Sequence, residues 1–222
     1  MDYYTTTQHK TETVFVKSLP VGPLSCNMTV LADMKTKRAI ICDPGGDAEE
    51  IFKIIDSNGF TVDRILVTHA HLDHFLAADI VKEKYQCPVY LHPDDLDMWI
   101  MLPFQCMLLG LAQPTKTVAL PKETLKEGSE LGICGGKCIH TPGHTKGSVC
   151  FYFPEDKILI TGDTLFREGV GRTDLWGGNH QEIMISIKER LFQLPDDTIC
   201  VPGHGPWTTI GHEKKENQFI AQ

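Results

Sequence analysis

A dense group of metal-ligand side chains constrains the fold of this chain more than any other feature of its sequence. Directly after an apolar run that is expected to form a strand stand His69, His71, Asp73 and His74. Histidines two apart on an extended backbone point the same way, and the last two ligands fall in the first turn of an expected helix. A polar loop with chance histidines explains this pattern poorly, because such a cluster beside a buried strand has few roles other than metal binding.

Three later positions carry further candidate ligands. His144 lies in the segment H-T-P-G-H-T, Asp163 in I-T-G-D-T and His204 in P-G-H-G-P. Each follows an apolar run and lies in a glycine-containing loop, and loops on a rigid scaffold commonly carry functional side chains. The remaining histidines are expected to have roles other than metal binding: His9, His92, His140, His180 and His212.

Runs of β-branched and apolar residues alternate with segments of helical periodicity along the chain. Strands are expected at residues 14–16, 28–32, 38–42, 64–68, 88–91, 130–134, 137–140, 148–153, 158–160 and 198–201. Helices are expected at residues 47–58, 72–85, 94–111 with a break near Pro103, 179–191 and after residue 210. Two sheets packed together with helices outside would bury the apolar faces, which predicts an α/β fold of layered α/β/β/α type in residues 13–222. Residues 1–12 are expected to form an N-terminal extension of limited order.

The net charge and the distribution of apolar residues limit which partners and which cellular compartment we expect. The 222 residues carry a formal net charge of −8, and an acidic surface repels the phosphates of nucleic acid. The N-terminal segment is polar, without the apolar stretch of a signal peptide, and no apolar run approaches the roughly 20 residues needed to cross a bilayer. We therefore expect a cytoplasmic protein that binds neither nucleic acid nor membrane.

The eight cysteines are scattered, and most stand in apolar runs. This distribution favours buried, reduced thiols over a disulfide framework. Cys134 and Cys138 form a C-x-x-x-C pattern with two glycines between them, which could hold a metal. Because no second Cys or His pair has matching zinc-finger spacing, a hairpin turn at the glycines is the favoured interpretation.

Taken together, the ligand motifs resemble those of the metallo-β-lactamase superfamily. The pattern H-x-H-x-D-H followed by a later His, Asp and His is highly specific, and the resemblance extends over residues 14–220. The nearest branch looks like glyoxalase II, or hydroxyacylglutathione hydrolase, in a short form. The segments D-P-G-G at 43–46 and G-V-G-R-T-D at 169–174 fit that branch. The resemblance implies a four-layer αββα sandwich.

The resemblance also implies a site for two divalent cations. One ion would be held by His69, His71 and His144, the other by Asp73, His74 and His204, with Asp163 as the bridge between them. No cysteine belongs to this set, so it suits zinc best and admits iron or manganese. Asp43 resembles a carboxylate that holds a ligand histidine in position.

For activity, the resemblance implies hydrolysis of a small-molecule thioester similar to S-lactoylglutathione. A hydroxide bridging two cations about 3.5–4 Å apart would attack the carbonyl, with Asp73 and Asp163 as catalytic carboxylates. A thiolate leaves without a general acid because the pKa of a thiol is only about 8.5. Arg172 matches a glyoxalase II lysine and would pair with a substrate carboxylate or, equally, with Asp174. Trp176 would line the pocket or pack in the core.

A related oxidoreductase is the main alternative. Persulfide dioxygenases resemble this branch and hold one iron through two histidines and an aspartate, here His69, His144 and Asp163. The ending P-G-H-G-P looks more like that of the short hydrolases. Glyoxalase II has a C-terminal helical region that helps to bind glutathione. That region is expected to be missing here, because the sequence continues for only about ten residues after Gly211.

Overall fold

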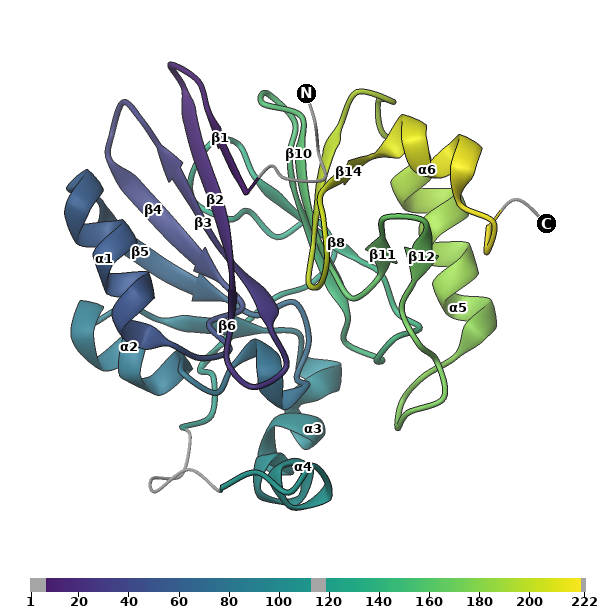
Figure 1. Cartoon of the computed structure of the whole chain (residues 1–222), viewed down its shortest axis with the longest axis horizontal. Coiled ribbons are helices and arrows are strands. Elements are labelled where there is room, and N and C mark those ends of the chain that lie inside the picture. Colours follow the sequence, from purple (N-terminus) through teal and green to yellow (C-terminus); the bar gives the residue numbers. More distant parts are fainter. Residues whose placement is uncertain (1–6, 113–118, 221–222) are drawn as a thin grey trace.

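Two β-sheets face each other in the computed structural model, which describes residues 7–112 and 119–220 (Figure 1). The first sheet contains, in spatial order, β1 (Gln8–Lys10), β2 (Val14–Val21), β3 (Cys26–Asp33), β4 (Arg38–Cys42), β5 (Thr61–Leu66), β6 (Val89–Leu91) and β7 (Glu123–Thr124). The second contains β14 (Thr208–Thr209), β13 (Ile199–Pro202), β10 (Ile158–Gly162), β9 (Val149–Phe153) and β8 (Lys137–His140). A short ribbon pairs β11 (Leu165–Phe166) with β12 (Gly169–Val170).

Helices cover the outer faces of both sheets, so the layers run α, β, β, α (Figure 1). The helices are α1 (Ala48–Asn58), α2 (Ala78–Tyr85), α3 (Leu96–Ile100), α4 (Leu102–Leu108), α5 (His180–Ile185) and α6 (Ile210–Glu216). Helices α1 and α2 pack on the first sheet, and α5 and α6 pack on the second. The layered α/β sandwich expected from the sequence is confirmed.

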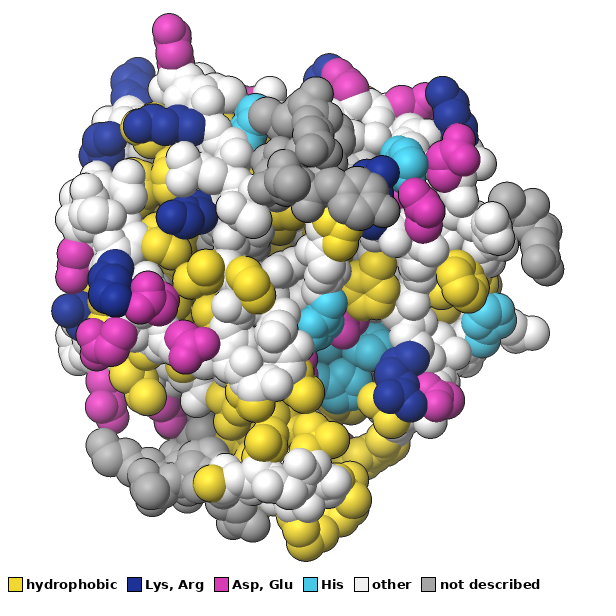
Figure 2. Space-filling model, viewed as in Figure 1, with side chains coloured by type: hydrophobic (Ala, Val, Ile, Leu, Met, Phe, Trp, Pro, Cys, Tyr) yellow, Lys and Arg dark blue, Asp and Glu magenta, His cyan; other side chains and the backbone are white. Residues whose placement is uncertain are grey.

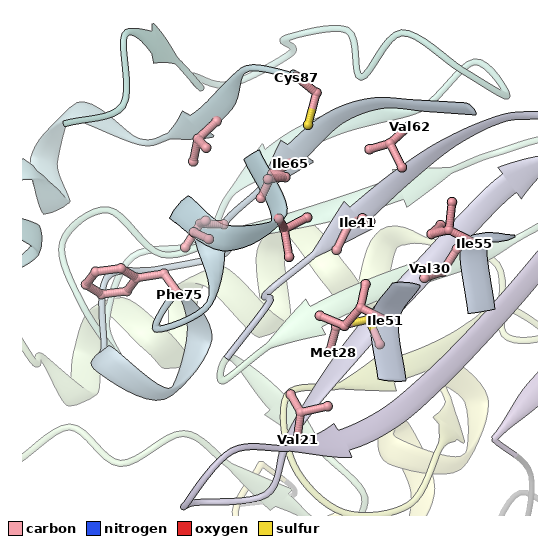
Figure 3. Close-up of a cluster of buried hydrophobic side chains, with 14 of the residues drawn as sticks. Val21, Met28, Val30, Ile41, Ile51, Ile55, Val62, Ile65, Phe75 and Cys87 are labelled. Atoms are coloured by element: carbon pink, nitrogen blue, oxygen red, sulfur yellow. The ribbon is translucent and has the colours of Figure 1, made fainter. Parts of the chain in front are cut away.

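Strand alternation explains why the first sheet is buried on both faces. Consecutive side chains of a strand point to opposite sides. Within β3, Val30 packs in the cluster under α1, whereas Leu31 packs between the two sheets. Ile51 and Ile55 of α1 complete the outer cluster, which Figure 3 shows in close-up.

The space between the sheets holds a second apolar cluster. Leu31 from the first sheet meets Phe151 and Ile160 from the second, and all three are at most 3% exposed. Burial of a side chain of this size contributes about 1.5–3 kcal/mol, so this layer fixes how the two sheets lie against each other.

Parallel pairs of strands bring distant loops to one edge of the sandwich. In the first sheet β4 runs parallel to β5, and in the second β10 runs parallel to β13. The carboxyl ends of parallel strands lie at the same edge, where open α/β sheets commonly bind ligands. A hydrogen bond from the Val149 amide to the Thr68 carbonyl, 2.9 Å long, joins the two halves near this edge.

Two of the expected helices are interrupted in the structure. The segment 72–85 consists of a 3₁₀ turn (Leu72–His74) followed by α2. The Ala77 amide donates to the Pro44 carbonyl at 2.9 Å, which takes this donor out of a continuous helix. The segment 179–191 passes from α5 into a π-helical turn (Ser186–Arg190).

Two expectations about strands also need correction. Residues 130–134 do not form a strand, because only Glu130 makes a bridge, to Lys137. Within the expected N-terminal extension, β1 pairs in antiparallel fashion with β2, while residues 1–6 lie outside the described part. The expected break near Pro103 is present as the boundary between α3 and α4.

The cysteines are free thiols, and seven of the eight are buried. Cys134 lies in a tight turn in which the Gly136 amide donates to the Ile133 carbonyl at 3.0 Å, so the glycines form the expected hairpin turn. Across residues 7–112 and 119–220, no helix combines the length and apolarity needed to cross a membrane.

Candidate metal centre

The candidate ligands come together at the carboxyl ends of strands from both sheets. Residues 69–74 follow β5, His144 lies between β8 and β9, Asp163 follows β10, and His204 follows β13. The structure thus brings all seven sequence-predicted ligands into one place: His69, His71, Asp73, His74, His144, Asp163 and His204. In the space-filling view, histidine side chains gather in a hollow of this face (Figure 2).

Three histidines form the first half of the centre. His71 Nδ1 lies 3.1 Å from His69 Nε2 and 2.9 Å from His144 Nε2. Burial, together with the neighbouring imidazoles, lowers the pKa of His69 well below its usual range and that of His71 to about 3. Burial also lowers the pKa of His144. These rings are therefore neutral, which is the form that binds metal.

Asp73, His74 and His204 form the second half. Asp73 Oδ2 lies 3.1 Å from His204 Nε2 and 3.6 Å from His74 Nε2. Burial alone would raise the pKa of Asp73, but His74 and the hydrogen bond with His204 hold it below its usual value. Asp73 is therefore ionised and able to serve as an oxygen ligand.

Asp163 stands between the two halves. Its Oδ1 atom lies 3.5 Å from His74 Nε2, and its Oδ2 atom lies 3.6 Å from His144 Nε2. Oδ2 is also 3.8 Å from His204 Nε2. A carboxylate whose oxygens lie near ligands of both halves is placed to serve both.

Unpaired buried atoms show that this donor set fits cations. His74 Nε2 and Asp163 Oδ1 are buried without a hydrogen-bond partner. Leaving such groups unpaired costs about 1–3 kcal/mol each, and more when charged, unless something else satisfies them. Cations placed beside these two atoms would satisfy both of them, and the other imidazole nitrogens of the centre lie close enough to join them.

Hydrogen bonds behind the ligands orient the rings. Asp43, at the end of β4, accepts from the Thr68 amide and hydroxyl at 2.7 Å each, and its Oδ2 lies 2.9 Å from His74 Nδ1. His144 Nδ1 lies 2.8 Å from the Arg172 carbonyl. These contacts put a proton on Nδ1 and leave the Nε2 lone pair free to face the centre.

Sequence reasoning missed Asp95, which ties two ligand loops together. Its buried carboxylate accepts from the Ala70 amide at 2.9 Å, the Thr145 hydroxyl at 2.8 Å and the Gly147 amide at 2.7 Å. Ala70 lies between two ligand histidines, and Thr145 follows His144. Asp95 lies just beyond the strand expected at 88–91, much as Asp43 follows its own strand, and that position could have identified it.

Two amides brace the remaining loops and were also missed. Gln105 of α4 accepts from the Leu72 amide at 2.9 Å and donates to the Ala70 carbonyl at 3.0 Å. Asn27 donates to the Pro202 and Gly205 carbonyls at 3.0 and 2.8 Å, on either side of His204. Nothing in the local sequence of either amide points to such a role.

Gly203 allows the ligands on either side of it to approach closely. A Cβ atom at this position would collide with Oδ1 of Asp163 and would lie 2.9 Å from Cε1 of His74. Gly203, the first glycine of P-G-H-G-P, is thus required by its packing against two ligands and not by the turn itself.

The centre opens into a cavity of about 360 Å³. Arg172 and Trp176 line this cavity, so Trp176 belongs to the pocket and not to the core. Arg172 also forms a two-point ion pair with Asp174, in which Nε and Nη2 each donate at 2.8 Å. The expected ion pair of Arg172 with Asp174 is therefore present, whereas its expected pairing with a substrate carboxylate stays a prediction.

Two other side-chain groups with ligand atoms nearby fit a metal less well. His92 and His140 stack at 4.2 Å with an angle of 9° between their planes, so in-plane lone pairs cannot meet at one ion. Cys26 lies behind His74, with Sγ 3.5 Å from Nδ1, and burial raises the pKa of its thiol to about 12. Cys26 Sγ thus contacts the nitrogen of His74 that Asp43 also contacts, and not Nε2, which lies near Asp73 and Asp163.

Comparison with known sequences matches residues 21–204 to the family model of the metallo-β-lactamase superfamily. The probable metallo-hydrolase YqgX of Bacillus subtilis (strain 168) is 39% identical over 210 residues, covering 92% of this chain and 96% of the relative. The hydroxyacylglutathione hydrolase GloC of Haemophilus influenzae is 35% identical over 209 residues, covering 92% of this chain and 97% of the relative.

Solved structures match the fold over nearly its whole length. The crystal structure of BLEG-1 B3 metallo-β-lactamase has a TM-score of 0.86 and 38% identity, and the match covers 93% of this chain and 100% of that one. The structure of TTHA1623 in a di-iron-bound form has a TM-score of 0.81 and 37% identity, covering 91% and 98%. These relatives extend the similarity beyond the ligand motifs to the whole sandwich.

Proposed function

The chain belongs to the metallo-β-lactamase superfamily, and we propose that it is a thioester hydrolase with two divalent metal ions. The observation that carries this proposal is the position of Asp163 between two trios of ligands, which fits two cations better than one. Similarity to the hydrolase GloC supports the reaction class.

Each half of the centre would hold one ion. His69, His71 and His144 would bind the first, Asp73, His74 and His204 the second, and Asp163 both. The ions would supply a nucleophile by acidifying water near neutral pH and would stabilise negative charge on the carbonyl oxygen. The nitrogen and oxygen donors suit zinc and admit iron or manganese, and the di-iron-bound TTHA1623 supports iron as a candidate.

The protein's own groups would position the reactants. Asp73 is ionised, and its carboxylate can accept a hydrogen bond from the attacking water and so orient it. Asp163 would hold the two halves at a fixed separation. The leaving thiolate needs no proton from the protein because its pKa is only about 8.5. Hydrolysis then returns a carboxylic acid and a thiol.

We further propose that the substrate is a small-molecule thioester. Glutathione thioesters such as S-lactoylglutathione are the compounds with which other thioesters should be compared. Arg172 is the lining residue that could pair with a substrate carboxylate. The proposed compartment is the cytoplasm, and neither nucleic acid nor membrane is a proposed partner.

A thioester assay on the zinc-loaded and iron-loaded protein tests this function. We expect thiol release from S-lactoylglutathione or from a simple acyl thioester, and its loss in Asp163→Ala and Asp163→Asn. The matched control is Asp197→Ala, which removes a surface aspartate paired with Lys157. Full activity of both Asp163 variants would reject the proposal.

Oxygen consumption distinguishes the alternative activity. A persulfide dioxygenase would take up oxygen with glutathione persulfide and would need a single iron. If that reaction were found and no thioester were cleaved, the hydrolase assignment would be replaced by the oxidoreductase.

A further inference from the structure

We propose that the substrate carries an apolar group of several carbon atoms, so that the protein is selective for medium-chain or aromatic thioesters. This inference rests on the proposed thioester hydrolysis and narrows its substrate class. It arises from a set of exposed apolar side chains beside the candidate metal centre, which we call the apolar wall: Leu24, Phe104, Leu108, Leu109, Leu175 and Trp176.

The apolar wall and the metal centre belong to one cavity. His71, Asp73 and His204 line the same space of about 360 Å³ as the side chains of the wall. A group that covers the wall therefore lies beside the atoms where the reaction would occur. This continuity identifies the occupant as part of the substrate, in preference to a lipid surface or a partner protein.

Exposed apolar side chains are concentrated at this place. Among residues 7–112 and 119–220, six of the twelve exposed large hydrophobic side chains line the cavity, so their distribution is far from even. Trp176 is 58% exposed and Leu108 67% exposed. In Figure 2 hydrophobic side chains cover the surface directly beside the histidines, in the part of the molecule that α3 and α4 form in Figure 1. Contiguous exposed apolar surface of this kind marks a binding site.

Hydrogen bonds hold part of the apolar wall in a fixed position beside the metal centre. Gln105 of α4 bonds to the backbone of Ala70 and Leu72, in the loop that carries the first ligands. Phe104 and Leu108 lie on the same helix as Gln105. The fold therefore fixes the position of this part of the wall relative to the reacting centre.

Charge in the cavity argues against a highly anionic substrate. Within residues 7–112 and 119–220, Arg172 is the one Lys or Arg that lines the cavity, and Asp174 already pairs with it at two points. The two carboxylates of glutathione would each need a cationic or polar partner. An uncharged apolar group needs none, and its transfer from water into contact with the wall is favourable.

A series of thioesters measures this preference. In the first series, acetyl, butyryl, hexanoyl and octanoyl thioesters of N-acetylcysteamine share one neutral thiol and differ in the length of the acyl group. In the second series, the acyl group is always acetyl and the alkyl chain of the thiol becomes longer. In each case water adds to the acyl carbon, the C–S bond breaks, and a carboxylate, a thiol and a proton are released. We expect kcat/KM to rise about fourfold per methylene in at least one series until the cavity is filled.

Matched variants locate the effect on the wall. Leu109→Asn changes a cavity-lining side chain that is 51% exposed, and Ile185→Asn changes one of equal exposure on α5, outside the cavity. We expect Leu109→Asn and Trp176→Ala to lower kcat/KM about fivefold or more for a long-chain member of the series that shows the rise, with the shortest member of that series changed by less than about twofold. Ile185→Asn should leave both values unchanged.

The outcomes separate this inference from the proposed function. If no thioester is cleaved, the hydrolase assignment fails. If the acetyl ester is cleaved but kcat/KM stays flat or falls along both series, the hydrolase stands and the apolar specificity is rejected. A more than tenfold preference for S-lactoylglutathione over the N-acetylcysteamine esters would also reject it, as would equal effects of the Leu109 and Ile185 variants.

Discussion

At the scale of single residues, the candidate centre brings several charged side chains together in a buried place. Asp43, Asp73 and Asp163 surround the ring of His74, and all four side chains are mostly buried. Burial works against a proton on His74, but these three carboxylates raise its pKa well above the usual value. Buried charges need partners. The same negative potential that would hold a proton on His74 would hold a divalent cation in its place.

Asp95 gives the most specific prediction at this scale. Asp95→Asn would place an amide group against backbone N–H groups that now donate to a carboxylate, so one buried donor loses its acceptor. We expect the free energy of unfolding to fall by about 1–3 kcal/mol. Thioester turnover should fall as well, because Asp95 joins the loop of residues 69–74 to the loop that carries His144, and both loops would shift. Urea denaturation and the thioester assay measure these effects.

The neighbouring Asp94 provides the control for that experiment. The Asp94 side chain is 56% exposed, so Asp94→Asn should change the free energy of unfolding by less than about 0.5 kcal/mol. Equal stability and activity of the Asp95 and Asp94 variants would show that Asp95 does not position the ligand loops.

At the scale of elements, the sequence predicted strands better than helix continuity. The strands that end in ligands were found with small shifts because short continuous apolar runs mark strands that are buried on both faces, and β4 and β8 have the expected bounds. The helix expected at 72–85 failed because a contact with distant Pro44 takes the Ala77 amide. Such a long-range hydrogen bond leaves no mark in local periodicity. The ligands were predictable from residue type, and the place of Asp95 after a strand was a signal that went unused. Gln105 was not predictable, because its partners are backbone atoms.

The segment from 169 to 174 yields a prediction about substrate charge. Asp174 is 69% exposed, and its hydrogen bonds with Arg172 lower its pKa to about 2, so the ion pair persists throughout the neutral range. Asp174→Asn would free the guanidinium for an anionic substrate. We expect the KM for S-lactoylglutathione to fall while the KM for a neutral acyl thioester stays unchanged. Steady-state kinetics with both substrates checks this, and a parallel change in both KM values would contradict it.

At the scale of the whole molecule, each half of the sandwich supplies part of the centre. The first sheet carries residues 69–74, and the second carries His144, Asp163 and His204. Ions bound among these ligands would bind only the folded chain, because the unfolded chain has no such site. Metal binding would therefore stabilise the packing of one sheet on the other.

The buried thiols predict a loss of stability in alkaline solution. Burial raises the pKa of Cys87 to about 11 and of Cys150 to about 12, and it raises the pKa of every other cysteine as well. Unfolded thiols lose their protons from about pH 8.5. Above that pH the unfolded state binds fewer protons than the folded state, so the free energy of unfolding falls. The urea midpoint in a reducing buffer should be lower at pH 10 than at pH 7.5.

Two further observations belong with that experiment. At pH 8 the folded protein should react slowly with a thiol reagent, and all eight cysteines should react after denaturation. A urea midpoint that stays constant or rises between pH 7.5 and pH 10 would contradict the thiol argument.

The central claim is that seven side chains from four loops hold two metal ions, and metal quantification tests it most directly. The protein would be loaded with zinc, or separately with iron, freed of excess ion by gel filtration, and analysed for metal per chain. We predict two ions per chain in the native sequence, a loss of binding in Asp163→Ala, and unchanged content in Asp197→Ala. A native chain that retains no ion, or an Asp163→Ala variant that still retains two, would contradict the account.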